Sequence, residues 1–149
     1  MSIVQLAESP MSGLDQLTAW INGGGQPPIG ETLDFRLVEV EEGRAVFEGV
    51  PDLRVYNPIG MVHGGYAATL LDSACGCAVH SRLTAAQTYS TLELKIAYHR
   101  AITAQTGLVR ADGRVLSLGR RAAFAEATLK TSSGRLLASA TSTLLIMDR

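Results

Sequence analysis

Residues 57–83 read NPIGMVHGGYAATLLDSACGCAVHSRL, and a helical pattern begins at His63. From there the segment is apolar on nearly every side, except for one carboxylate, Asp72. A helix that is apolar all round is normally buried, and a carboxylate is rarely fully buried unless a partner holds it there. The segment therefore predicts a buried central helix, in which Asp72 lies either at a wet edge or at a functional site.

Two glycines, Gly64 and Gly65, open this helix directly after His63. They leave the first amides of the helix approachable, and a helix N-terminus favours developing negative charge. A carboxylate and an anion-binding amide in one segment suggest that water attacks a carbonyl group. The same glycines could also serve backbone geometry alone.

The remaining chain shows shorter patterns around this helix. Residues 12–22 predict an amphipathic helix with Ser12 as its N-cap, whereas residues 1–11 predict a frayed end. Gly113, in the middle of the segment 105–118, suggests a β-bulge there. A two-residue period predicts strands at residues 32–41, 43–51, 88–100, 105–118, 119–131 and 135–147. The alanine-rich segment 119–131 could be a helix on propensity alone.

One antiparallel sheet of five to six strands with a long helix lying across it is an α+β arrangement. We expect residues 1–149 to form a single domain, with residues 1–29 as an N-terminal extension of one short helix and a loop. The sheet can cover only part of a helix that is apolar all round. A second copy of the chain is the simplest cover for the rest, so we expect an obligate dimer or a larger assembly.

The composition excludes several classes of function. Of 149 residues, 46% are hydrophobic and 18% charged, and the net charge is −1, so nothing in the totals favours binding to nucleic acid or to a membrane surface. The first residues lack the pattern of a signal peptide, so a cytoplasmic location is expected. Cys75 and Cys77 lie two residues apart on the helix and are expected to be buried thiols rather than a disulfide. We expect no metal site, and we expect His80 and His99 to be solvated.

The combination of Asn57, His63-Gly64-Gly65 and Asp72 at this spacing resembles the active-site segment of hotdog-fold acyl-CoA thioesterases. The most similar branch is the PaaI-like one, related to the phenylacetate-pathway and 4-hydroxybenzoyl-CoA thioesterases. The resemblance covers residues 30–147 and implies a hotdog fold, in which the sheet wraps around the central helix. It also implies a homodimer or homotetramer, no metal, and no cofactor other than the coenzyme A of the substrate.

The resemblance implies a role for each matching residue. Asp72 would be the general base or nucleophile, the Gly65 amide the oxyanion donor, and Asn57 a contact to the thioester carbonyl or to water. His63 would orient the loop, and Thr91 would be a polar contact behind the reacting groups, although strand alternation places Thr91 with Glu93, away from the face of Leu92. The expected substrate-binding residues are Gly64, Tyr66, Tyr89 and Arg120.

The helical geometry makes the expected site intermolecular. Seven residues separate Gly65 from Asp72, which places them about 10 Å apart along the helix axis. One thioester carbon can hardly reach both groups on one helix, so we expect Gly65 and Asn57 from one chain and Asp72 from another. The expected activity is hydrolysis of aryl- or medium-chain acyl-CoA. The alternatives are a hotdog hydratase or dehydratase, and a non-catalytic acyl-CoA sensor.

Overall fold

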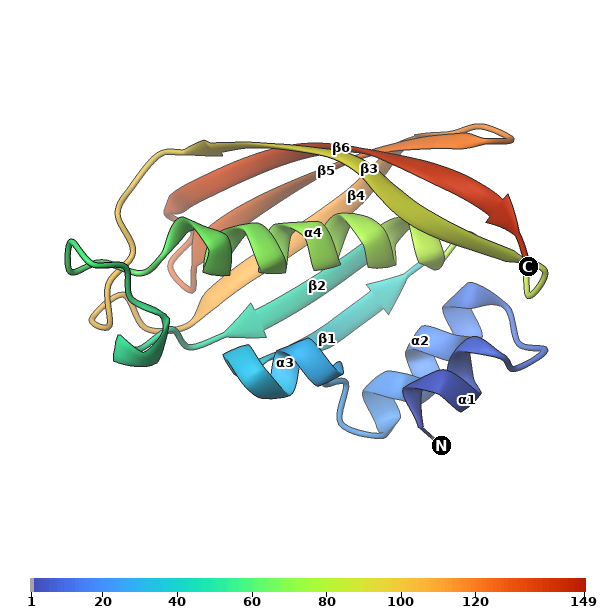
Figure 1. Ribbon diagram of the computed structural model, residues 1–149, viewed down its shortest axis with the longest axis horizontal. Coiled ribbons are helices and arrows are strands. Elements are labelled where there is room, and N and C mark those ends of the chain that lie inside the picture. Colours follow the sequence, from blue (N-terminus) through green and yellow to red (C-terminus); the bar gives the residue numbers. More distant parts are fainter. Residues whose placement is uncertain (1) are drawn as a thin grey trace.

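The computed structural model describes residues 2–149, except for the side chain of Ile3, and shows one antiparallel sheet with a long helix across one face (Figure 1). The sheet has six strands in the order β1-β2-β4-β5-β6-β3, and this confirms the predicted hotdog architecture. The elements are α1 (Ile3–Ala7), α2 (Gly13–Asn22), α3 (Pro28–Leu33), β1 (Phe35–Glu41), β2 (Arg44–Gly49), a 3-10 turn (Leu53–Val55), α4 (Gly64–His80), β3 (Gln87–Tyr98), β4 (Val109–Leu118), β5 (Ala122–Thr131) and β6 (Leu136–Asp148).

Helix α4 is the centre of the core, as its apolar sequence predicts. Leu70, Leu71 and Ala74 are fully buried against the sheet, and the thiols of Cys75 and Cys77 are buried as expected. Gly113 of β4 lies beneath this helix, and a side chain there would run into the backbone of Ala74. The predicted bulge at Gly113 is wrong, because this glycine pairs regularly and allows close helix–sheet contact. The bulge of β4 lies between Val115 and Ser117 instead.

Strand β3 forms one edge of the sheet and contains a bulge between Thr91 and Glu93. The extra residue, Leu92, is 61% exposed, whereas Leu94 and Ile96 pack against the core. The predicted two-sided alternation is therefore wrong at Leu92. Because a bulge shifts the side-chain parity by one residue, Thr91 lies on the same side of the sheet as α4.

The N-terminal segment contains more helix than its sequence pattern predicts. Residues predicted to be frayed form α1, whose N-terminus carries a reciprocal capping box of Ser2 and Gln5. The predicted first strand starts late, because Pro28 opens the short helix α3 and Asp34 ends it in the left-handed conformation. The predicted helix with its Ser12 cap is confirmed as α2. Within residues 2–149, no helix combines the length and hydrophobicity needed to cross a bilayer.

Candidate active site

Asp72 lies halfway along α4 with its carboxylate half-buried between the helix and β3. Thr91 Oγ1 donates a hydrogen bond to Asp72 Oδ1 over 3.0 Å, which the bulge in β3 makes possible. The carboxylate is therefore held by a specific partner rather than standing at a wet edge. It opens onto a groove of about 360 Å³, which we call the acyl groove.

The acyl groove follows α4 from Asp72 towards its C-terminal end. Asp72 and His80 lie eight residues apart, or about 12 Å along the axis. One wall comes from α4 and β3 through Cys77 and Tyr89, and the opposite wall comes from the N-terminal extension and β2. The wall-forming apolar residues of these elements are Leu6, Leu17, Trp20, Pro27, Ile29 and Phe47. No motif in the sequence connects the extension with the site, although the apolar stripe of α2 indicates a face that packs against another element.

His80 closes the far end of the acyl groove and is not solvated as expected. Its Nε2 lies 2.8 Å from Oε1 of Gln16, a side chain that is only 3% exposed. Because the amide nitrogen of Gln16 donates to the carbonyl of Met11, Oε1 is left as the acceptor and His80 Nε2 carries the proton. Burial, and to a smaller extent the nearby charge of Arg149, lowers the pKa of His80 to about 4. The ring is therefore neutral at pH 7.

We expect the His80→Gln variant to lose part of the acid sensitivity of the wild-type fold. The pKa of His80 is about 4 in the folded chain and 6.5 when solvated, so between these values only the unfolded chain takes up the proton. Above pH 6.5 the ring is neutral in both states and does not change the free energy of unfolding. Below pH 6.5 proton uptake by the unfolded chain lowers this free energy, by about 2 kcal/mol at pH 5. Urea unfolding at pH 7 and pH 5 measures this, with His99→Gln at an exposed histidine as control. Equal decreases in wild type and His80→Gln would contradict the assignment.

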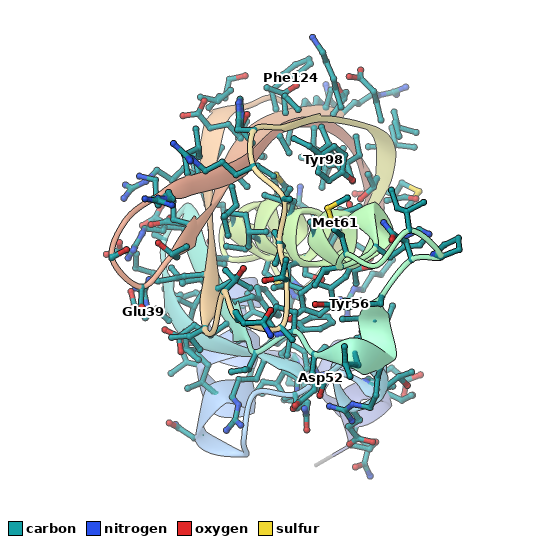
Figure 2. The ribbon with its side chains drawn as sticks, turned by 90° about the vertical axis from the view of Figure 1, so that its left-hand side faces the viewer. Glu39, Asp52, Tyr56, Met61, Tyr98 and Phe124 are labelled. Atoms are coloured by element: carbon teal, nitrogen blue, oxygen red, sulfur yellow. The ribbon has the colours of Figure 1, made fainter. Side chains whose placement is uncertain are left out.

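A second groove, of about 320 Å³, lies at the N-terminal end of α4 and contains Asn57, His63, Gly64 and Tyr98. Asn57 Oδ1 accepts hydrogen bonds from the amides of Ile59 and Met61, both over 3.1 Å, and so fixes the loop before the helix. Its Nδ2 remains as a donor. Figure 2, which looks onto this end of the molecule, shows Tyr98 and Met61 beside the start of α4 and Phe124 on the outer side of the sheet.

The first amides of α4 differ in their partners. Gly65 N–H donates to Nδ1 of His63 over 2.8 Å, so the helix cap occupies it. Gly64 N–H has no acceptor among the residues that the structure describes, and Gly64 lines the groove beside Asn57. Tyr98 Oη donates to the Gly64 carbonyl over 2.7 Å and so fixes the peptide between Gly64 and Gly65. The Gly65 N–H is therefore engaged by the helix cap, whereas the Gly64 N–H has no acceptor among the described residues, and the oxyanion donor stays a prediction.

The structure places the four expected substrate-binding residues differently. Gly64 lines the second groove and Tyr89 the acyl groove. Tyr66 is only 3% exposed and points into the core towards Gly49, so its assignment to a groove wall is wrong. Arg120 is exposed in the turn between β4 and β5 and lines neither groove, so this assignment is not supported either.

The carboxylate and the free amide do not meet within one chain. Gly64 and Asp72 are eight residues apart on α4, about 12 Å along the axis, and they line different grooves. Each chain therefore presents these two groups in separate grooves along the same helix.

Comparisons with known proteins show the family and the fold of the chain. A family model described as the thioesterase superfamily matches residues 59–138, which include α4 and the strands β3 to β5. The chain is 27% identical over 119 residues to a 1,4-dihydroxy-2-naphthoyl-CoA hydrolase of Listeria monocytogenes, covering 80% of this chain and 95% of that protein. It is 27% identical over 117 residues to the proofreading thioesterase EntH of Klebsiella pneumoniae, covering 78% of this chain and 84% of that one. The structure of the E. coli PaaI protein shares the fold, with a TM-score of 0.78 at 17% identity over 93% of this chain and 96% of that chain.

Proposed function

Because the chain belongs to the thioesterase superfamily and is a thioester hydrolase, we propose that it hydrolyses acyl-CoA thioesters with aryl or medium-chain acyl groups. The observation that carries this proposal is the position of Asp72, a half-buried carboxylate at the mouth of an apolar groove. A groove of about 360 Å³ is at the small end of the range of ligand sites and suits a compact acyl group.

The proposed chemistry needs two groups of this chain. The Gly64 N–H, at the positive end of α4, would bind the thioester oxygen as it becomes an oxyanion, and the Asn57 amide would assist it. Asp72 would take a proton from the attacking water or attack the carbonyl carbon directly. The tetrahedral intermediate then expels the thiolate of coenzyme A, which is a good leaving group and needs no strong acid. We propose no metal or resident cofactor.

We propose that a second copy of the chain completes the site. Within residues 2–149, strand β3 pairs with β6 on one side and has no partner strand on the other, and it carries Leu92 and Tyr98, which are 61% and 53% exposed. An exposed edge of this length is normally covered. If two copies paired antiparallel through β3, with the twofold axis between residues 94 and 95, Tyr98 of one protomer would lie opposite the partner's Thr91. The Gly64 end of one chain would then meet the Asp72 end of the other.

The coenzyme A moiety of the bound substrate would extend from the site past Arg100. This residue lines the second groove and also a neighbouring polar depression that contains Arg135, Thr131 and Ser133. Two guanidinium groups among hydroxyls suit phosphate oxygens. We therefore propose Arg100 and Arg135, in place of Arg120, as the cations that face the coenzyme A phosphates.

The test of this function is the release of free coenzyme A from a panel of aryl, short-chain, medium-chain and long-chain acyl-CoAs. We expect release to be fastest with aryl or medium-chain groups, because the acyl groove is apolar but short. Tight binding of these compounds without release would indicate a sensor. Turnover of an enoyl-CoA that leaves the thioester intact would indicate a hydratase.

A further inference from the structure

A second chamber lies behind the wall that the N-terminal extension contributes to the acyl groove. It has a volume of about 430 Å³ and lies among α1, α2 and α3, which Figure 1 shows grouped along one side of the molecule. We call it the extension chamber. Nothing in the proposed reaction occupies this space. Its lining includes Leu6, Ala19, Trp20, Gly23, Pro28 and Glu31.

Two side chains, Leu6 and Trp20, line the extension chamber and the acyl groove alike. Leu6 is only 7% exposed, and Trp20 is partly buried against the core. The chain divides the two spaces again at the start of α3, where Pro27 lines the acyl groove and Pro28 lines the chamber. The two spaces therefore lie on opposite sides of one shared apolar wall.

The geometry of α2 places Trp20 at the boundary between the two spaces. Leu17, which lines the acyl groove, lies about 60° from Trp20 in one direction around the helix axis, and Gly23, which lines the chamber, lies about 60° away in the other. The order along the helix agrees, since Gln16 and Leu17 precede Trp20 and line the groove, whereas Gly23 follows it. The indole therefore separates the groove from the chamber.

The space behind the indole suits the end of an alkyl chain. Next to Trp20 the chamber is lined by the apolar residues Leu6, Ala19 and Pro28, and Glu31 is exposed. Burial of methylene groups against such a lining is favourable. A compact acyl group fits in the acyl groove alone, whereas a long linear chain needs the volume that lies beyond the indole.

We propose that Trp20 is a specificity-determining residue, whose indole ends the space for the acyl group and so limits the length of linear acyl chains. The inference rests on the proposed acyl-CoA hydrolysis and adds the residue that sets this limit. In wild type, a chain that outgrows the acyl groove meets the indole, and kcat/KM falls. Without the indole, the chain continues into the extension chamber.

The experiment measures kcat/KM for butanoyl-, octanoyl-, dodecanoyl- and hexadecanoyl-CoA, below the concentrations at which they form micelles, in wild type, Trp20→Ala and Trp20→Leu. We expect Trp20→Ala to raise the ratio of kcat/KM for hexadecanoyl-CoA to that for octanoyl-CoA about 10- to 100-fold, because the added methylene groups become buried. Trp20→Leu should raise this ratio less. It also removes less packing, so it decides the test where the alanine variant does not fold.

A second substitution tests whether the gain comes from the chamber. Ala19 lines the extension chamber but not the acyl groove, and it is exposed on α2, so Ala19→Phe fills the chamber without disturbing the groove. We expect Ala19→Phe alone to keep the wild-type ratio. Combined with Trp20→Ala, it should return the ratio to within about threefold of wild type, because neighbouring substitutions are not additive. A gain that survives this filling overturns the inference.

A binding measurement gives a readout that does not depend on turnover. Trp20 is the one tryptophan in the sequence, so the tryptophan emission of the chain reports on this wall alone. In the Asp72→Asn chain, octanoyl-CoA should shift the emission to shorter wavelengths, because the acyl group replaces water beside a partly buried indole. Free coenzyme A, which lacks the acyl group, should leave the emission unchanged.

Each outcome decides the inference. If wild type releases coenzyme A, an emission that does not respond to octanoyl-CoA, or one chain-length profile shared by wild type and both Trp20 variants, overturns the role of Trp20 and leaves the thioesterase proposal intact. A wild type that releases coenzyme A from none of these compounds or of the wider acyl-CoA panel overturns both.

Discussion

Replacing Asp72 by Asn is expected to lower kcat for acyl-CoA hydrolysis about 10²- to 10⁴-fold, with a much smaller change in KM. The substitution removes the group that takes the proton of water or attacks the carbonyl, but the amide oxygen can still accept the hydrogen bond from Thr91 Oγ1. The strand and the helix therefore keep their contact. Steady-state kinetics on the best substrate of the panel, with circular dichroism to show an intact fold, measures the effect.

The matched control for this prediction is Glu126→Gln. Glu126 is an exposed carboxylate on the outer face of β5, so its loss changes the net charge as Asp72→Asn does without touching the grooves. We expect its kcat to stay within about twofold of wild type. Full turnover by a folded Asp72→Asn protein would remove Asp72 from the mechanism and leave it as a structural partner of Thr91.

Replacing Gly64 by Pro is expected to lower kcat about 10²- to 10³-fold, because it deletes the proposed oxyanion donor. The fold should tolerate the change. Gly64 is the first residue of α4, where proline is favourable, and His63 already has φ −59° and ψ 135°, the conformation that a following proline requires. Gly64→Ala is the control, since it keeps the N–H and adds only a methyl group 3.0 Å from Tyr98 Oη. A proline variant as active as the alanine variant would exclude the Gly64 amide as oxyanion donor.

The two inactive variants together test whether the site is shared between protomers. In a mixed dimer of Asp72→Asn and Gly64→Pro chains, one site combines the two intact halves and the other combines the two altered halves. Random exchange makes half of the dimers mixed, so denaturing and refolding an equal mixture should restore about a quarter of wild-type activity. If both groups served one site within a single chain, the mixture would remain as inactive as its components.

The sequence predicts the architecture well because its signals are periodic. The apolar run of α4 and the alternation in β5 and β6 are patterns that burial enforces along a whole element, and even the alanine-rich β5 follows them. The spacing of Asn57, His63 and Asp72 likewise identified residues that line the two grooves. The N-cap Ser12 correctly marked the start of α2.

The errors arise where one residue or one atom decides the structure. A single bulge at Leu92 reverses the side-chain parity of β3, and no alternation pattern reveals where it falls. The choice between Gly64 and Gly65 depends on which amide the His63 ring caps, which requires atomic geometry. His80 looked solvated because its partner, Gln16, lies 64 residues earlier in the chain. Tyr66 and Tyr89 are equivalent in type, and only the packing separates a core ring from a groove ring.

The walls of the acyl groove come from two parts of the gene. Asp72, Cys77 and Tyr89 lie within the segment that the family model matches, whereas Leu17 and Trp20 precede it by about forty residues. If this groove binds the acyl group as proposed, mutations in the first thirty codons can change which acyl group is accepted while the codons for Asp72 and Tyr89 stay unchanged. A lineage with this organisation can exchange one substrate for another through its leading segment, without passing through an inactive ancestor.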